Sequence, residues 1–258
     1  MNRKLRIVLI VIFALIFVGS GGYLAVNLIE RGQGRAEYAG IQEQMGDLER
    51  LVIPSTQLED PKGFDLVDNR QVIAERMAAM AEQNDDLAAW LYIPGTDINL
   101  PVMQAGDNEY YLKRSFSRQY RSCGSLFLDW RNDPGFDNLN SVIYGHNMRD
   151  GSMFCSLLDY KDADFFNQHR TVYVFLPDGS QLTYEIFSVY VTDGWDDYWD
   201  LELKGDPEAF IAEAAARSLH RADPSPLATG EVLTLSTCEY STDEGRFAVH
   251  ARRMVSPE

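Results

Sequence analysis

The chain is poor in cysteine and in positive charge. Three cysteines among 258 residues, Cys123, Cys155 and Cys238, are too few for a disulfide framework, and their odd number leaves at least one unpaired. Cys123 and Cys155 could pair, but two ordinary thiols are the favoured interpretation. Lysine and arginine number 23 against 39 aspartate and glutamate residues, so the formal net charge is -16. An acidic chain lacks the basic face that nucleic acid requires, which excludes that class of partner.

Motifs for metals, nucleotides and repeats are also missing. The four histidines and three cysteines lack the close pairing of zinc sites, so we expect no metal centre and no cofactor. No glycine-rich phosphate loop follows a predicted strand, and there is no internal repeat. One acidic cluster would suit a cation site or a substrate rim, although a solvated loop is favoured; it surrounds Trp195 and comprises Asp193, Asp196, Asp197 and Asp200.

One uncharged stretch is long enough to cross a bilayer as a helix. It runs over about 23 residues, from Ile7 to Ile29. Basic residues precede it, so the positive-inside rule places the N-terminus in the cytoplasm. A cleaved signal peptide is the alternative, because Gly19 to Ala25 includes small residues. We predict a basic cytoplasmic tail over 1–6, a transmembrane anchor over 7–29, a polar juxtamembrane spacer over 30–65 and an extracellular folded domain over 66–258.

The folded part is predicted to be mostly β with some α. Apolar runs bounded by turn residues predict eight strands, and the turn Pro177-Asp178-Gly179-Ser180 predicts a hairpin. About eight strands with few helices favour a closed β-barrel. The predicted strands are 90–93, 97–103, 125–130, 141–144, 171–176, 181–191, 232–238 and 246–255. Helices are predicted over 68–83, 153–159, 163–168 and 207–220.

Cys238 is the most informative residue, because it ends the strand predicted over 232–238. Alternate side chains of a strand share a face, so Leu233 and Leu235 point one way while Ser236 and Cys238 point the other. A thiol that served only in packing would more naturally share the leucine face. Cys238 is therefore predicted to be a nucleophile, and Arg246, which opens the next strand, could stabilise an oxyanion near it.

A thiol needs a base, because its reference pKa of about 8.5 leaves it mostly protonated at neutral pH. His146 lies just past the strand 141–144, next to a glycine, as expected of a residue presented into a cleft. His250 is the rival, on the same strand face as Arg246 but about 13 Å further along. His169 and His220 lie at the ends of predicted helices, where C-terminal capping explains them. The pattern favours His146 as the catalytic histidine, and His250 remains the alternative.

These residues resemble the sortase family, and class B sortases within it. Thr234-Leu235-Ser236-Thr237-Cys238, followed eight residues later by Arg246, resembles the signature Thr-Leu-x-Thr-Cys with a later arginine. Tyr144-Gly145-His146-Asn147-Met148 resembles the histidine motif. The segment 86–116 and the helix 207–220 ahead of the cysteine strand are also similar to class B members. The resemblance covers about residues 68–255.

The resemblance implies an eight-stranded sortase barrel with N-terminal helices and a cysteine transpeptidase at the surface of a Gram-positive-type cell. The implied substrate is a secreted protein with a C-terminal sorting motif, cut after its threonine. The implied acceptor is an amine of the cell wall or of a pilin. Cys238 would form the thioester, His146 would be acid and then base, and Arg246 would hold substrate and oxyanion. Ser236 and Tyr144 are candidate substrate contacts.

Two other functions are compatible with parts of the sequence. A thiol hydrolase acting on cell-wall peptides would cut without an amine acceptor, but the arrangement of Cys238 and Arg246 argues against it. A membrane-anchored binding module with an idle thiol would need none of the three candidate catalytic residues. The sorting motif and the amine acceptor are not specified by the sequence. Some class B members have an acid two positions after the cysteine, where this chain has Tyr240, so no fourth catalytic residue is assigned.

Overall fold

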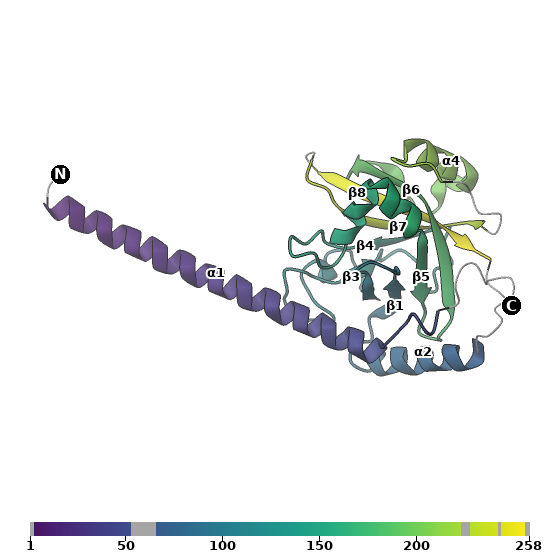
Figure 1. Ribbon diagram of the computed structural model, residues 1–258, viewed down its shortest axis with the longest axis horizontal. Helices are drawn as coiled ribbons and strands as arrows, with labels where there is room; N and C mark the ends of the chain where they lie inside the picture. Colours follow the sequence, from purple (N-terminus) through teal and green to yellow (C-terminus); the bar gives the residue numbers. More distant parts are fainter. Residues whose placement is uncertain (1–2, 53–65, 223–227, 242–243, 256–258) are drawn as a thin grey trace.

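The computed structural model describes residues 3–52, 66–222, 228–241 and 244–255 and shows a long N-terminal helix joined to a β-rich body (Figure 1). The α-helices are α1 (Arg3–Met45), α2 (Leu66–Ala81), α3 (Ala163–Gln168) and α4 (Pro207–Arg217). Short 3-10 helices are η2 (Tyr110–Leu112), η3 (Cys155–Lys161), η4 (Asp197–Trp199) and η5 (Leu203–Gly205). The strands are β1 (Leu87–Tyr92), β2 (Asn99–Met103), β3 (Leu126–Leu128), β4 (Asn140–Tyr144), β5 (Thr171–Phe175), β6 (Gln181–Asp193), β7 (Ala228–Cys238) and β8 (Gly245–Met254).

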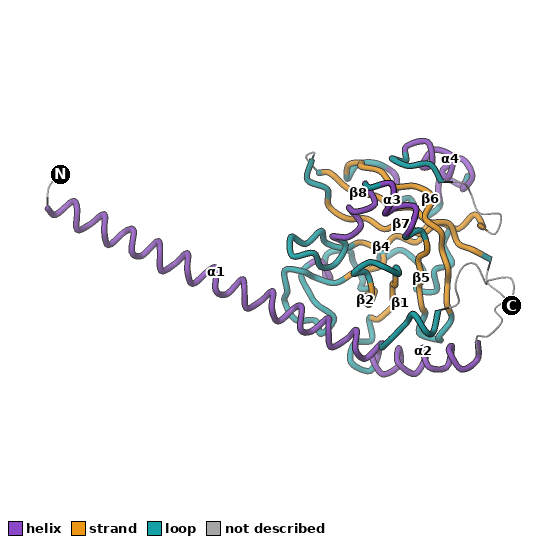
Figure 2. Tube along the Cα trace, in the orientation of Figure 1, coloured by secondary structure: helices purple, strands orange, loops and turns teal. Residues whose placement is uncertain are grey.

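The eight strands form a closed barrel in the order β1-β2-β3-β4-β7-β8-β6-β5, which confirms the predicted fold class. Figure 2 shows the strands gathered in the body, with the first part of α1 extending away from it. Most neighbours are antiparallel, but β2 pairs with β3 and β4 pairs with β7 in parallel. Parallel neighbours end at the same edge of the sheet. The chain segments that follow β4 and β7 are therefore brought together, although they are far apart in the sequence.

The strands of the barrel carry apolar cores on both of their faces. Inward-facing Leu233, Leu235 and Val249 belong to the main core inside the barrel. A second, smaller core lies where α4 packs on β6 and β7, and it includes Phe187, Ile211 and Val232. β6, β7 and β8 are therefore covered by apolar side chains on both faces over much of their length. They provide the fixed frame from which the site residues project.

The predicted hairpin and the predicted helices are confirmed with small shifts at their ends. β5 and β6 pair across the turn at 177–180, where Gly179 has φ +82° and a Cβ would collide with the carbonyl of Arg70. Only glycine satisfies both conditions. In α2, Ile73, Met77 and Met80 are buried at helical spacing, as the apolar stripe predicts.

Helix α1 differs in character along its length. Its first part exposes large apolar side chains, among them Phe17 at 80 %. Its last turns bury Tyr38, Ile41 and Met45 against the barrel, and the Tyr38 hydroxyl donates to the carbonyl of Gly124 at 2.6 Å. Spacings of three and four residues place these three side chains on one helical face. The helix is thus apolar and unpartnered at one end and part of the body at the other.

The region predicted as a polar spacer over 30–65 is structured in its described part. Residues up to Met45 continue α1 without a break, and Leu48 and Val52 are also buried in the main core. Residues 53–65 lie outside the described residues. The polar composition of 30–45 hid this packing because glycine, glutamine and glutamate dilute the apolar stripe.

Candidate active site

Cys238 and Arg246 stand directly opposite each other at the open ends of β7 and β8. The antiparallel register pairs Cys238 with Arg246, Thr237 with Phe247 and Ser236 with Ala248. Directly opposed residues have Cβ atoms about 5 Å apart. The guanidinium of Arg246 donates to the carbonyls of Glu244 and Gly245 at 3.2 and 3.1 Å, which holds its Nη1 end at the strand turn. A thiol and a fixed cation therefore share one strand edge.

His146 reaches the same edge from the neighbouring strand. β4 ends at Tyr144, which pairs with Ser236 in the parallel β4–β7 ladder. Gly145 makes the close turn after the strand, since a Cβ there would lie 2.4 Å from Leu126 and 2.6 Å from Phe154. The Nε2 atom of His146 is 2.7 Å from the carbonyl oxygen of Leu112. A carbonyl only accepts, so Nε2 carries the proton of the neutral ring and Nδ1 is the nitrogen left with a lone pair.

Three hydrogen bonds tie the histidine segment to the cysteine strand. The amide of Gly145 donates to the carbonyl of Ser236 at 3.1 Å, and the hydroxyl of Thr237 donates to the carbonyl of Gly145 at 2.8 Å. The side-chain amide of Asn147 donates to the carbonyl of Cys238 at 3.1 Å. These bonds alternate along the two segments, so they fix the position of His146 relative to Cys238.

One cavity of about 450 Å³ brings the predicted residues together. Cys238, His146 and Arg246 all line it, and all three are partly exposed. A cavity of this size accommodates a short peptide segment. The remaining lining residues are Asn108, Leu112, Phe127, Arg131, Tyr144, Gly145, Gly194, Tyr198, Trp199, Ser236 and Thr237.

Ser236 and Tyr144, the two predicted substrate contacts, also line the cavity but already have protein partners. Ser236 is 2 % exposed, and its Oγ is 2.9 Å from the hydroxyl of Tyr198. The Tyr144 hydroxyl donates to Asp129 at 3.1 Å. Burial raises the pKa of Tyr144, with the nearby Asp129 charge as the next cause, so Tyr144 is neutral at any physiological pH.

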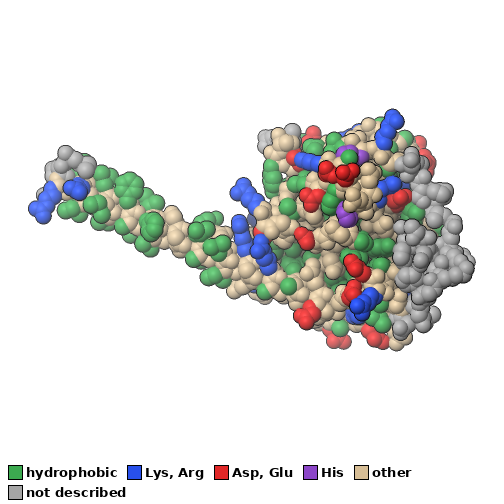
Figure 3. Space-filling view, viewed as in Figure 1, with side chains coloured by type: hydrophobic (Ala, Val, Ile, Leu, Met, Phe, Trp, Pro, Cys, Tyr) green, Lys and Arg blue, Asp and Glu red, His purple; other side chains and the backbone are tan. Residues whose placement is uncertain are grey.

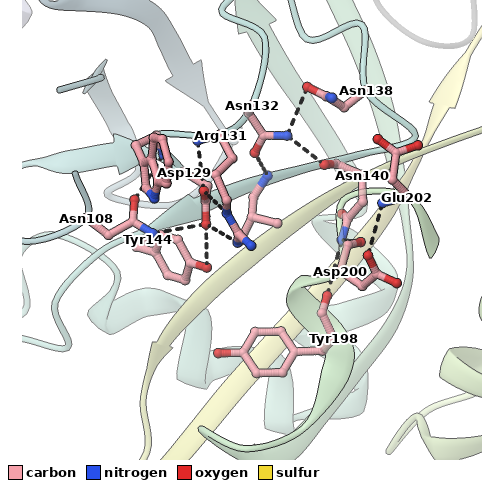
Figure 4. Close-up of polar contacts among 12 residues, drawn as sticks. Asn108, Asp129, Arg131, Asn132, Asn138, Asn140, Tyr144, Tyr198, Asp200 and Glu202 are labelled. Carbon is pink, nitrogen blue, oxygen red and sulfur yellow. Dashed lines mark hydrogen bonds and ion pairs between the residues drawn. The ribbon is translucent and has the colours of Figure 1, made fainter. Parts of the chain in front are cut away.

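The sequence reasoning missed a polar network behind the cavity wall (Figure 4). Asp129, just past β3, is fully buried and receives hydrogen bonds from three cavity-lining residues. Arg131 donates through Nε and Nη2, both at 2.8 Å, and Asn108 donates at 3.0 Å alongside the Tyr144 hydroxyl. The run Asp129-Trp130-Arg131-Asn132 after an apolar strand was the available signal.

The charge of Asp129 is stabilised by these donors. Burial alone would raise the pKa of Asp129, but the hydrogen bonds from Arg131 and Asn108 outweigh it and hold the pKa below its usual value. Arg131 also lies over the ring of Trp199, with its Cζ 5.1 Å from the centroid. One carboxylate thus orients three side chains that face the cavity.

His250, the rival histidine, lies outside the cavity and is completely buried. Thr234 donates its hydroxyl proton to Asn140 at 2.7 Å, so it accepts from Nδ1 of His250 at 2.9 Å. Nε2 then accepts from the Tyr190 hydroxyl, also at 2.9 Å. Burial lowers the pKa of His250 to about 3. A ring held neutral between two hydroxyls has both nitrogens engaged and does not reach the cavity that holds Cys238.

The remaining candidates are structural. All three cysteines are free, so Cys123 and Cys155 do not pair. In the acidic cluster around Trp195, Asp196 pairs with Arg217 and Asp197 with Lys204. Within the described part of the chain, no three side chains of the metal-binding types gather into a cluster.

The site combines a thiol, an imidazole and a guanidinium at one cavity wall. A thiol beside an imidazole can attack a carbonyl and form an acyl-enzyme, and a fixed guanidinium can stabilise the resulting oxyanion. The lining combines apolar and aromatic side chains with a few polar and charged groups, which would suit a peptide segment. Such a site fits acyl transfer on peptides.

The chain is similar to known proteins over most of its length. A family model described as "Sortase domain" matches residues 91–254. Sortase B of Staphylococcus aureus (strain NCTC 8325 / PS 47) is 29% identical over 256 residues, which cover 98% of this chain and 97% of that protein. Sortase B of Listeria monocytogenes serovar 1/2a (strain ATCC BAA-679 / EGD-e) is 32% identical over 188 residues, 70% of this chain and 74% of that protein.

Solved structures show the same likeness in three dimensions. A Staphylococcus aureus sortase B–substrate complex superimposes with a TM-score of 0.73 at 28% identity and covers 89% of this chain and 100% of that chain. Clostridium perfringens sortase B superimposes with a TM-score of 0.62 at 34% identity, covering 69% of this chain and 99% of that chain. The likeness therefore extends from the sequence motifs to the barrel.

Proposed function

This chain belongs to the sortase family of cysteine transpeptidases, and on that premise we propose that Cys238, His146 and Arg246 carry out its reaction. The observation that supports this assignment is that all three line one cavity at the ends of β7, β8 and β4. Cys238 would attack the carbonyl carbon of the threonine in a sorting motif and form a thioester. The C-terminal tail would leave as an amine. An incoming amine would then attack the thioester, which restores the thiol and forms a new amide.

His146 handles the proton in both half-reactions. Its Nε2–H is held by the carbonyl of Leu112, which leaves Nδ1 as the nitrogen that exchanges a proton with the reacting groups. The ring takes the thiol proton as Cys238 attacks and passes it to the leaving amine; the neutral ring then accepts a proton from the incoming amine and returns it to the thiolate. The hydrogen bonds through Gly145 and Asn147 keep the ring in register with Cys238.

Arg246 stabilises the negative charge that develops on the substrate carbonyl. It lies opposite Cys238 in the β7–β8 register, and its Nη1 is anchored on two backbone carbonyls. Arginine suits this role because it stays protonated and its donors are fixed in a plane. Ser236 and Tyr144 stay predictions as substrate contacts, with Asp129 orienting Tyr144 from behind.

Helix α1 anchors the enzyme in the cell membrane, with the N-terminus in the cytoplasm and the barrel outside. It is the one helix among the described residues that is long and apolar enough to span a bilayer, and its apolar stretch is unburied. Basic residues lie before the stretch, as the positive-inside rule requires. This topology places the cavity where exported proteins pass. The partners are then secreted proteins with a C-terminal sorting motif and an amine of the cell wall or of a pilin subunit.

The test uses the full chain in detergent micelles with quenched peptides that carry candidate sorting motifs. Each peptide is incubated with and without an amine acceptor, and the acyl-enzyme is trapped for mass spectrometry. We expect a motif-dependent adduct on Cys238 that passes to the amine. Cys238→Ala should abolish the adduct, and Cys155→Ser is the matched control, since Cys155 is also a partly exposed free thiol but lies outside the cavity.

Two results would contradict the assignment. An adduct on another residue would remove Cys238 from the mechanism. An adduct that only hydrolyses, with every acceptor amine, would favour the thiol hydrolase over the transpeptidase. Arg246→Lys and His146→Gln, each with an unchanged melting temperature, should lower the transfer rate by about two orders of magnitude or more.

A further inference from the structure

We propose that a rim of basic side chains around the exit of α1 docks the barrel on the anionic phospholipid surface of the membrane. The rim consists of Arg31, Lys113, Arg114 and Arg149. This inference rests on the proposed anchor and adds a second, electrostatic contact between the enzyme and the bilayer. The contact would set which way the active-site cavity faces.

The first observation is where the body meets α1. Ser122 donates its backbone amide and its hydroxyl to Glu30, which directly follows the uncharged stretch ending at Ile29. Arg35, little more than one turn later, donates to the carboxylate of Asp150 at 3.2 Å and to its carbonyl at 3.1 Å. Two loops of the barrel therefore contact α1 within about two turns of the membrane-spanning stretch.

The second observation is that these two loops carry the basic residues. Lys113 and Arg114 are held beside Ser122, because the amide of Arg121 donates to the carbonyl of Lys113 at 3.0 Å and Arg114 bridges to Tyr120. Arg149 immediately precedes Asp150 and is exposed. Figure 3 shows basic side chains gathered at the edge of the body from which α1 emerges.

The third observation concerns the partners of these charges. Among the residues that the structure describes, no carboxylate pairs with Arg31, Lys113, Arg114 or Arg149; Arg114 instead lies over the ring of Tyr110, 4.5 Å from its centroid. The acids nearby are already engaged, Glu30 by Ser122 and Glu37 by Arg121. The rim is thus a positive patch without carboxylate partners among the described residues, so it can bind an external anion.

Charge complementarity identifies the occupant. The first 35 residues hold five basic residues and one acid, about +4, which leaves about -20 for the rest of the -16 chain. An anionic bilayer repels such a body as a whole, so the body turns its basic edge toward the lipid. Each basic residue near an anionic surface contributes about 1 kcal/mol. Tyr120, 67 % exposed on the same loop, is the type of residue that settles at the headgroup level.

The experiment compares amide hydrogen exchange of the full chain in two kinds of nanodisc, one of phosphatidylcholine and one of an equal mixture with phosphatidylglycerol. We expect exchange in 113–122 and 147–152 to slow by about tenfold in the anionic discs, and this protection to disappear at high salt. The double variant Lys113→Glu, Arg149→Glu should lose the lipid-dependent protection. Its matched control is Arg70→Glu, Lys204→Glu, which changes the charge equally at two exposed sites outside the basic rim.

The outcomes separate this inference from the anchor and from the catalytic assignment. A chain that does not incorporate into either disc would refute the anchor and the docking together. A chain that incorporates but shows equal exchange in both lipids, or equal loss in the two double variants, would refute the docking alone. Peptide transfer by detergent-solubilised protein tests the catalytic residues independently, because neither Lys113 nor Arg149 lines the cavity.

Discussion

Asn147 donates its side-chain amide to the backbone carbonyl of Cys238 at 3.1 Å, so the residue after the histidine holds the strand end that carries the thiol. The two residues come from segments that are adjacent only because β4 and β7 pair in parallel. The bond acts on the position of Cys238, the proposed nucleophile, and not on its chemistry. Asn147 is therefore a positioning residue.

Replacing Asn147 with alanine should lower kcat by about fivefold and leave KM nearly unchanged, because one hydrogen bond of about 1 kcal/mol orients the reacting groups. The measurement is the steady-state rate of transfer with a quenched peptide that the wild-type enzyme cleaves, together with the melting temperature of the variant. Tyr240→Phe is the control, since its hydroxyl makes a long contact of 3.4 Å to the Asn147 carbonyl on the exposed rim. A change in KM alone would show that Asn147 contacts substrate instead.

Asp129→Asn should destabilise the protein by about 2 kcal/mol, because a buried carboxylate that accepts from Arg131 is replaced by a neutral amide. It should also raise KM, since Arg131, Asn108 and Tyr144 lose their common acceptor. Asp137→Asn, at an exposed aspartate in the loop that follows, is the matched control. Urea titration with tryptophan fluorescence gives the first quantity and peptide kinetics the second. An unchanged KM would limit Asp129 to a role in stability.

The same variant has a defined pH dependence. The folded pKa of Asp129 lies below the value of an unfolded aspartate, so its stabilising contribution is present above about pH 4 and is lost as the pH falls through the folded pKa. The stability difference between the wild type and Asp129→Asn should therefore be constant from neutral pH to about pH 5 and shrink below about pH 4. A difference that grows on acidification would contradict the assignment of the charge.

His250 should make the fold sensitive to mild acid. Its folded pKa of about 3 lies well below that of an unfolded histidine, so its contribution is complete above about pH 6.5 and declines as the pH falls toward 3. The slope is about 1.4 kcal/mol per pH unit in that window. Unfolding at a series of pH values should show a shallower slope for His250→Asn. Tyr190→Phe keeps the imidazole and should keep the slope.

Cys123 should be slow to alkylate at neutral pH. Burial raises its pKa to about 11, and the charge of Glu30 acts in the same direction. At pH 8 the thiolate is about one thousandth of the total, since each pH unit is a factor of ten. Peptide mapping after a short iodoacetamide pulse should find Cys123 unmodified at pH 8 and modified near pH 11. Rapid labelling at pH 8 would show that α1 opens away from Cys123.

Local patterns in the sequence predicted the barrel strands and the Cys238–Arg246 pair well, because the seven residues between the two predicted strands leave room only for a tight connection. The position of His146 beside Cys238 depends on the parallel pairing of β4 and β7, which are separated by more than eighty residues. The histidine motif could indicate that contact only through family resemblance. Asp129 had a local signal in its position after an apolar strand, but its role could not be assigned, because Asn108 and Tyr144 donate to it from distant segments.

The packing of α1 on the barrel could likewise not be predicted from the sequence. Tyr38, Ile41 and Met45 have helical spacing, but Gly34, Gly40 and several polar residues dilute the stripe. What these three side chains contact is decided by the barrel surface, which local periodicity does not describe. A polar composition therefore suggested a spacer where the structure has a docked helix.

The unbroken course of α1 determines how much clearance the enzyme leaves above the bilayer. On the proposed topology, with Ile7–Ile29 in the lipid, the contact between Ser122 and Glu30 would bring the body within about one helical turn, about 5.4 Å, of the bilayer. No folded domain can pass through such a gap. A substrate of the proposed kind would therefore approach sideways, as an extended chain, and would need enough unfolded length between its folded part and its sorting motif to reach the cavity.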